Sequence, residues 1–124
     1  NGKMSDVAAA FILERARHLE TIRAAYLREF RRVAGIARTL GLELLVDVEP
    51  EGSLPNLVPI LFPRPVEAGR LAGGPMVMHK YYRPVATTPR AERVYARVVC
   101  VPCHRDVERV GDGELRAMLN DLMG

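Results

Sequence analysis

Aromatic residues are scarce in this sequence, which contains no tryptophan, three phenylalanines and four tyrosines. A hydrophobic core must therefore be built mainly from Leu, Val, Ile, Ala and Met side chains. No apolar run approaches the ~18–20 residues that a membrane-spanning helix requires, and the polar opening residues lack the pattern of a secretion signal. We therefore expect a cytoplasmic protein with no membrane partner.

Cysteine is also rare, and the two cysteines lie together in Cys100-Val101-Pro102-Cys103-His104. The Cys-x-x-Cys-His pattern is typical of covalent haem attachment, and Cys-x-x-Cys alone is typical of a redox pair or half a zinc site. Haem attachment requires export, a zinc site requires four ligands, and a redox pair belongs in a βαβ unit. The sequence shows none of these features, so we interpret the segment as an apolar strand that stops at Pro102. A metal or redox role for Cys100 and Cys103 is the less favoured alternative.

With only two lysines, arginine supplies nearly all of the positive charge in a chain of net charge +3. A basic helix face is found in many nucleic-acid-binding proteins, but it is also an ordinary solvated face supported by pairs such as Glu14 with Arg17. The arginines near the start are scattered around the helix, and no aromatic set is interleaved with them, so we expect no nucleic-acid partner. These arginines are Arg15, Arg17, Arg23, Arg28, Arg31, Arg32 and Arg38.

The composition indicates a single folded domain, residues 1–124, that opens with a long helix. Apolar residues recur three and four apart over residues 5–40, where proline is absent. Ser5 is suited to cap the start of this helix, and Gly41 is suited to the left-handed conformation after its end. A straight helix of ~35 residues would be about 50 Å long, which exceeds what a small domain can cover. We expect a bend, at Gly35 or at Glu20–Thr21, or a partner that covers the excess.

The remaining residues, 42–124, alternate between short strands and short helices. Pro59 interrupts the hydrogen-bonding capacity of its strand, which predicts an edge strand or a bulge. The predicted fold class is α+β, with a long N-terminal helix and a small, mostly antiparallel sheet of about three strands with helices packed on one face. The expected strands are 42–48, 56–62, 76–82 and 98–101, and the expected helices are one or two turns within 64–71, then 89–98 and 114–123.

The opening Asn1-x-x-Met4-x-Asp6-x-x-Ala9-Ala10 resembles a stretch of the DegT/DnrJ/StrS family of pyridoxal phosphate-dependent, fold type I sugar aminotransferases. In that family the stretch follows the cofactor lysine and begins the helix that leads into the C-terminal domain. Three later segments are similar to the same domain in the same order. They are Pro89–Tyr95 with Ala91-Glu92, Arg97–Val107, and the closing helix from Gly113 to Met123.

The resemblance implies that this chain is the C-terminal domain of an aminotransferase that acts on keto-sugar nucleotides in aminosugar biosynthesis. The domain would close over the substrate and contribute to a homodimer. Tyr81 and Tyr82 match a stretch that approaches the sugar substrate. Asn1 and Lys3 match positions that reach the cofactor phosphate of the neighbouring subunit.

The resemblance supplies no catalytic residue within this chain. Pyridoxal phosphate enzymes require a lysine for the Schiff base, and the family's lysine lies upstream of the matching segment. Lys3 matches the phosphate-side position and Lys80 matches a strand, so neither is expected to bind the cofactor covalently. We predict that the chain alone is inactive and binds no cofactor. The alternative is a stand-alone, non-enzymatic binding or scaffold module.

Overall fold

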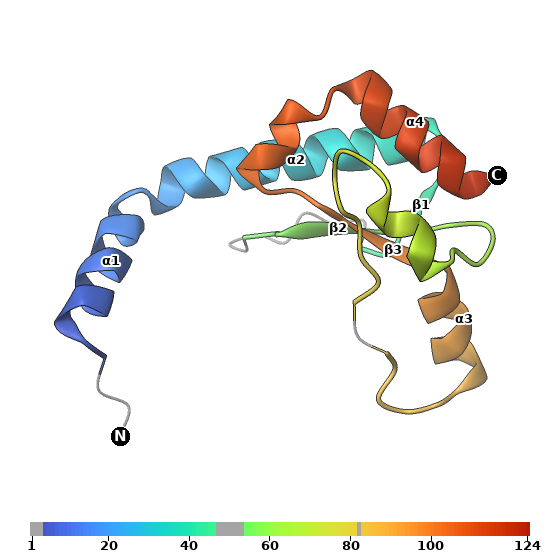
Figure 1. The fold of residues 1–124 in the computed structure, drawn as a ribbon, viewed down its shortest axis with the longest axis horizontal. Coiled ribbons are helices and arrows are strands. Elements are labelled where there is room, and N and C mark those ends of the chain that lie inside the picture. The colour runs from blue at the N-terminus through green and yellow to red at the C-terminus, as the bar shows by residue number, and fades with distance from the viewer. Residues whose placement is uncertain (1–3, 47–53, 82) are drawn as a thin grey trace.

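The computed structural model describes residues 4–46, 54–81 and 83–124, and it confirms the α+β class (Figure 1). Four α-helices, two short 3-10 helices and a three-stranded sheet make up this part of the chain. In chain order the elements are α1 (Asp6–Arg17), α2 (Leu19–Thr39), β1 (Glu43–Leu44), β2 (Leu57–Leu61), η1 (Ala68–Ala72), α3 (Pro89–Arg97), β3 (Val98–Pro102), η2 (Arg105–Arg109) and α4 (Asp112–Met123).

The long N-terminal helix bends at His18, which separates α1 from α2. His18 leaves the helical region of backbone space, with φ −103° and ψ 9°. The predicted bend at Glu20–Thr21 is therefore displaced by two to three residues, and the predicted bend at Gly35 is wrong because Gly35 lies inside α2. Ser5 caps the start of α1, since its Oγ accepts a hydrogen bond of 3.2 Å from the Ala8 amide.

The second helix, α2, contributes several side chains to the hydrophobic core. Its apolar side chains follow the helical period and bury Phe30, Val33 and Ala37 against the sheet. Gly41 follows with φ 72°, the left-handed conformation predicted for it. The Leu42 amide donates to the Ala37 carbonyl at 3.0 Å, and the Gly41 amide donates to the Arg38 carbonyl at 3.0 Å. These two bonds form a Schellman motif that turns the chain into β1.

The sheet is antiparallel with the order β1-β2-β3, so β2 is its central strand. The prediction that Pro59 marks an edge strand or bulge is therefore wrong. Pro59 lies opposite Cys100 of β3, whose own amide and carbonyl bond to His79 instead. On its other side the Pro59 carbonyl accepts a 2.9 Å bond from Leu45, just beyond the end of β1. Pro59 has no N–H with which to return a bond to Leu45, so this single bond replaces the reciprocal pair of an antiparallel ladder, and β1 ends one residue earlier, at Leu44.

The predicted strand 76–82 is not formed in the described residues. One bridge pairs His79 with Cys100 at the free edge of β3. Met78, one residue earlier, donates its amide to the Leu71 carbonyl of η1 at 3.1 Å. Neighbouring residues of this segment therefore bond to two different partners, the edge of β3 and η1, so the segment forms one bridge and no continuous ladder. The predicted strand 42–48 likewise contracts to β1, although residues 47 and 48 lie outside the described residues.

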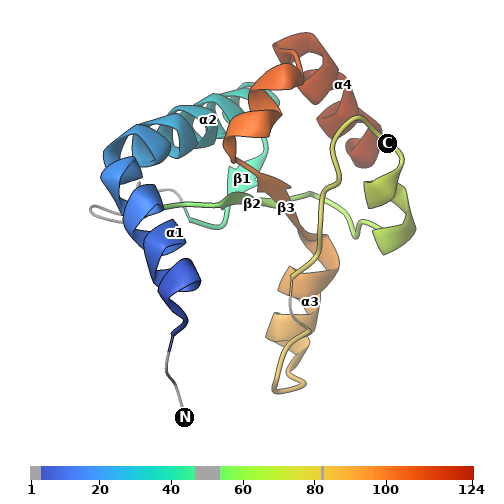
Figure 2. The same ribbon diagram turned by 60° about the vertical axis from the view of Figure 1, so that its left-hand side comes forward.

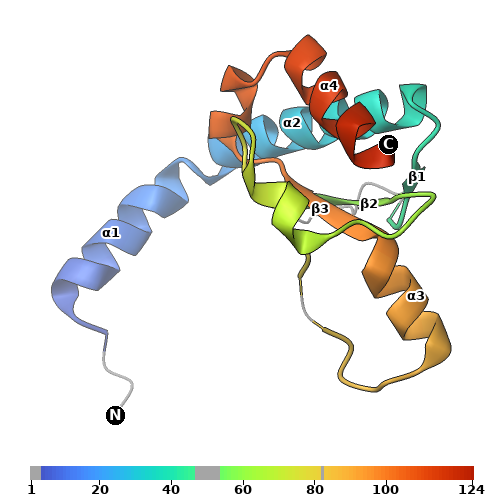
Figure 3. The same ribbon diagram turned by 45° about the vertical axis from the view of Figure 1, so that its right-hand side comes forward.

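The core lies between one face of the sheet and the two helices α2 and α4. The views in Figures 1, 2 and 3 place α2 and α4 on the same side of the sheet and α3 on the opposite side. The prediction that helices pack on one face holds for α2 and α4, while α3 continues directly into β3 at the sheet's far side. Every second residue of β2 and β3 is fully buried, as expected when one face of a sheet packs on the core. These residues are Val58, Ile60, Val99 and Val101, each 0% exposed.

A polar clamp joins α2 to the segment around η2 and α4. Glu29 is buried at 2% exposure, and its carboxylate accepts from Arg32 Nε at 2.8 Å and from Arg28 Nε at 3.3 Å. The same Arg32 guanidinium donates to the carbonyls of Val107 at 2.8 Å and Val110 at 3.1 Å. It also donates to Asp112 Oδ1 at 2.7 Å. Burial is the largest single effect on the pKa of Arg32 and lowers it. The hydrogen bonds and charges of Asp112 and Glu29 together outweigh burial, so the pKa is raised.

Candidate functional site

The structure describes one of the four site residues that the sequence predicts. Tyr81 lies within the described residues, whereas Asn1, Lys3 and Tyr82 lie outside them. Tyr81 follows the bridge between His79 and Cys100, so the edge of β3 sets its position. Its ring meets the His79 ring edge to face, with centroids 5.4 Å apart and planes inclined by 60°. Tyr81 is 44% exposed, so part of its side chain is open to a ligand.

Two hollows meet at Tyr81. The α3 hollow has a volume of about 470 Å³ and is lined by apolar groups of α3, including Val94 and Tyr95. The sheet-edge hollow has a volume of about 450 Å³ and includes His79 and His104 in its wall. A tyrosine between two such spaces offers a flat apolar face and a hydroxyl, which together suit the face and edge of a sugar ring.

Lys80 is bound to the end of α3 and is not available for covalent chemistry. Its Nζ donates to the Tyr95 carbonyl at 2.8 Å and also to the Ala96 carbonyl. The same cation lies 5.4 Å from the centroid of the Tyr95 ring. Burial lowers the pKa of Lys80, and the nearby Glu67 carboxylate partly opposes that shift. The Lys80 cation therefore stabilises the C-terminal end of α3, which carries the negative end of the helix dipole. A lysine held in this way does not fit the role of a cofactor-binding lysine.

The two cysteines occupy the core as neutral thiols. Both are buried, and Cys103 Sγ donates to the Pro55 carbonyl at 3.2 Å. Burial raises the pKa of Cys103 to about 12, with a further contribution from the Glu29 charge. Burial also raises the pKa of Cys100. Among the described residues, no three His, Cys, Asp or Glu side chains are grouped so that they could hold a metal ion.

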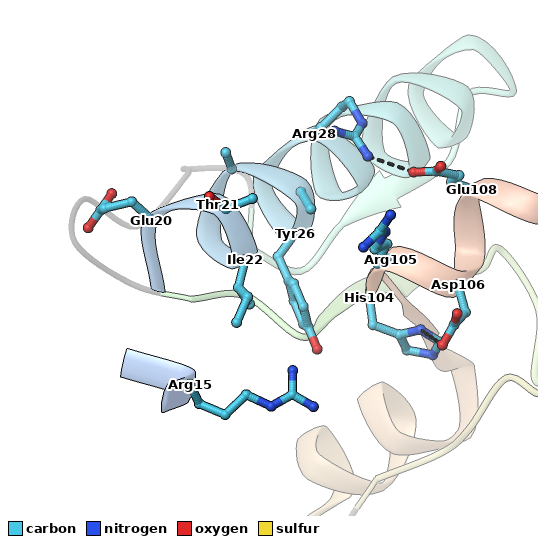
Figure 4. A pocket seen from close by; sticks show the side chains of 12 residues that line it. Arg15, Glu20, Thr21, Ile22, Tyr26, Arg28, His104, Arg105, Asp106 and Glu108 are labelled. Atoms are coloured by element: carbon cyan, nitrogen blue, oxygen red, sulfur yellow. Dashed lines mark hydrogen bonds and ion pairs between the residues drawn. The ribbon is translucent and has the colours of Figure 1, made fainter. Parts of the chain in front are cut away.

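A third hollow, larger than the two at Tyr81, lies between α1, the first turns of α2 and the η2 segment, and Figure 4 shows it from close by. We call it the helix hollow; its volume is about 1110 Å³. Arg15 reaches it from α1 and Tyr26 from α2, while His104 and Arg105 reach it from the other wall. Tyr26 and His104 also line the sheet-edge hollow, so the two spaces adjoin.

The first helix, α1, projects away from the rest of the described chain in Figures 1, 2 and 3. None of its residues is buried. Phe11 is 71% exposed and Leu13 is 65% exposed, with Ile12 exposed between them. Consecutive residues of a helix point in different directions, so apolar side chains surround α1 on several sides. A helix with this distribution is normally covered by other parts of a protein.

Comparison with known proteins leaves the family open. No protein-family model and no curated protein matches this chain. In the described ranges no helix combines the length and the apolar character needed to cross a membrane.

Sequence reasoning missed the residues of the helix hollow. Tyr26 fits the apolar stripe of the long helix, so it was expected in the core, yet it is only partly buried and faces the hollow. His104 was considered only as the end of the Cys-x-x-Cys-His pattern. Arg15 was assigned to a solvated helix face. The residues are separated by up to ninety positions along the chain, and no local pattern links them.

Proposed function

We propose that this chain is the C-terminal domain of a cytoplasmic, homodimeric, pyridoxal phosphate-dependent aminotransferase that acts on keto-sugar nucleotides. The observation that carries this proposal is the uncovered apolar surface of α1, which begins within the segment that resembles the DegT/DnrJ/StrS family. In that family this helix joins the cofactor-binding part of the enzyme to the C-terminal domain.

The surface of α1 supports a partner domain because exposure of so much apolar area is unfavourable. Burying a side chain such as Phe11 or Leu13 contributes ~1.5–3 kcal/mol relative to leaving it in water. Only a small part of that contribution is realised within the described residues, since no residue of α1 is buried. A larger cofactor-binding domain, preceding α1 in the same polypeptide, would cover this surface.

The positions of the other resembling segments also support the proposal. The segment Pro89–Tyr95 lies on α3, where Thr88 caps the helix by accepting from the Ala91 amide at 3.2 Å. The segment Arg97–Val107 runs through β3 into η2, and the closing segment forms α4. The segments on β3, η2 and α4 contribute buried residues to one core, as expected if they belong to a single inherited domain, whereas α3 contributes none.

In this proposal the chain binds and encloses the substrate but does not carry the cofactor. Pyridoxal phosphate supplies the electron sink for amino transfer when it is bound in the full enzyme. Lys80 does not fit the Schiff base because its Nζ is bound to the end of α3. Asn1 and Lys3 would contact the cofactor phosphate of the neighbouring subunit, and Tyr81 and Tyr82 would contact the sugar.

The test is to locate the lysine that binds pyridoxal phosphate in the intact polypeptide in which residues 1–124 occur. The purified polypeptide is supplied with the cofactor, reduced with borohydride and digested, and the modified lysine is identified by mass spectrometry. We expect the label on a lysine that precedes Asn1. A Lys80→Arg variant should retain both the visible absorbance of the lysine-bound cofactor and the label.

Two results would contradict the proposal. One is an intact polypeptide that binds no pyridoxal phosphate, which would favour a stand-alone binding or scaffold module. The other is a label on Lys80 that disappears in the Lys80→Arg variant, which would place the cofactor in this chain.

A further inference from the structure

We infer that the helix hollow is a binding site for a phosphate monoester. The hollow is formed by α1, α2 and η2, and it is distinct from the surface of Tyr81 that the proposed function uses. Its volume of about 1110 Å³ exceeds what a single inorganic ion needs, so the phosphate would be attached to an organic group.

The charge around the hollow is not balanced. The wall holds three arginines and three acidic side chains, but each acid is paired with a cation, two of them with arginines outside the wall, whereas Arg15 and Arg105 have no hydrogen-bond or ion-pair partner in the described part of the chain. Two guanidinium groups are therefore available to an anion. The paired acids are Glu20 with Arg23 at 3.7 Å, Asp106 with Arg109 at 3.9 Å, and Glu108 with Arg28 at 2.7 Å.

Neutral hydrogen-bonding groups face the same space. Figure 4 shows the Tyr26 hydroxyl and the Arg15 guanidinium pointing toward each other across the hollow, with the His104 ring on the opposite wall. The His104 Nδ1 lies 3.7 Å from the Asp106 carboxylate, which leaves the other ring nitrogen for a ligand. A tyrosine hydroxyl can donate to a phosphate oxygen, and an imidazole nitrogen can do so when it carries the proton.

The number of donors and charges favours phosphate over a carboxylate. A phosphate monoester carries ≈ −1.5 to −2 charge at pH 7 and has three strong acceptor oxygens, which suits a hollow whose wall carries two unpaired guanidinium groups and the Tyr26 hydroxyl. Guanidinium groups bind phosphate with two parallel hydrogen bonds. A single carboxylate has one negative charge and two oxygens, so it would leave one arginine without a partner.

The experiment measures binding of phenyl phosphate to the intact polypeptide by isothermal titration calorimetry, with inorganic phosphate and succinate as comparison probes. We expect saturable binding of phenyl phosphate that is tighter than that of either comparison probe. Arg15→Gln and Arg105→Gln should each weaken it by roughly tenfold or more, since hydrogen bonds to charged groups are the strong ones. Arg93→Gln, on the exposed surface of α3, is the matched control and should not change binding.

Three results would overturn the inference: no saturable binding of phenyl phosphate, equal binding of succinate, or unchanged binding in both arginine variants. Arg15 and Arg105 are exposed, and circular dichroism of each variant verifies that it is folded. The measurement requires no amino transfer and no added pyridoxal phosphate. Failure here would leave the proposed aminotransferase role intact, and failure of that role would leave this site intact.

Discussion

The Arg32 clamp provides the sharpest test of how this fold is held together, through the substitution Arg32→Met. Methionine keeps most of the aliphatic length of arginine and removes all of its donors. The change would leave the buried Glu29 carboxylate with only the 3.3 Å contact from Arg28. It would also remove the donors that bind the carbonyls of Val107 and Val110.

The expected loss follows from the burial of Glu29. Removing one partner of a buried ion pair costs ~3–5 kcal/mol, because the remaining charge is desolvated without compensation. Arg32 is 21% exposed and Arg28 remains as a partner, so the lower end applies, about 3 kcal/mol. That is a large fraction of the ~5–15 kcal/mol by which small domains are stable. Arg32→Lys keeps the charge but loses the planar fork and should cost ~1–2 kcal/mol.

The assay is urea unfolding followed by circular dichroism, with the free energy of unfolding extrapolated to water. A 3 kcal/mol loss should lower the urea midpoint by roughly 1–2 M for a domain of this size. The control is Arg17→Met on α1, where the Glu14 partner is exposed and the expected change is about 0–0.5 kcal/mol. If Arg32→Met is no more destabilising than Arg17→Met, the clamp does not hold η2 to α2 and the reasoning is refuted.

Three further predictions concern other parts of the chain. Gly35→Ala should raise the free energy of unfolding by about 0.5–1 kcal/mol, because Gly35 is inside α2 with open space around it. Gly41→Ala should lower the free energy of unfolding by about 1–2 kcal/mol, because φ is 72° at that position. Urea unfolding that gives both changes the same sign would contradict this. The Cys103 pKa of about 12 exceeds its ordinary value of 9.0, so the unfolded state loses its proton first and stability should fall as pH rises from about 9 to 12, by ~1.4 kcal/mol per pH unit. Cys103→Ala should show a shallower fall over that range, and an equal slope in both proteins would exclude the thiol as the cause. Phe11→Asp should change the stability of the isolated chain by less than ~0.5 kcal/mol but should lower the melting temperature of the intact polypeptide; no change in the latter would mean that α1 is not covered there.

Features set by neighbouring residues could be predicted from the sequence. The helical period alone was enough to place Phe30, Val33 and Ala37 on one face of the helix, and that face is the buried face of α2. Ser5 and Gly41 act at the helix ends through hydrogen bonds to residues three to five positions away. Such short-range geometry is encoded locally, so residue type and spacing are sufficient to predict it.

Features set by distant residues could not be predicted. Pro59 fits a central strand because its missing N–H faces the end of β1 and not β3, which depends on how three separate strands are paired. The bend at His18 has no glycine or proline to mark it. The helix hollow unites Arg15, Tyr26 and His104 through the path of three elements, which no periodicity in the sequence reveals.

The role of Tyr81 and Tyr82 stays a prediction, as does that of Asn1 and Lys3. For Tyr81, the structure supplies a half-open ring between two hollows, which is consistent with contact to a sugar. The other three residues lie outside the described part of the chain. Their roles rest on the resemblance alone.

We propose that this domain belongs to an enzyme that transfers an amino group to a keto-sugar. The most direct measurement incubates the intact polypeptide with pyridoxal phosphate, nitrogen-labelled glutamate and a nucleotide-linked keto-sugar, and follows the sugar product by mass spectrometry. We expect the labelled nitrogen to appear on the sugar, and to appear more slowly in a Tyr81→Ala variant. Absence of label from a panel of nucleotide-linked keto-sugars, with a folded polypeptide and the cofactor present, would contradict it.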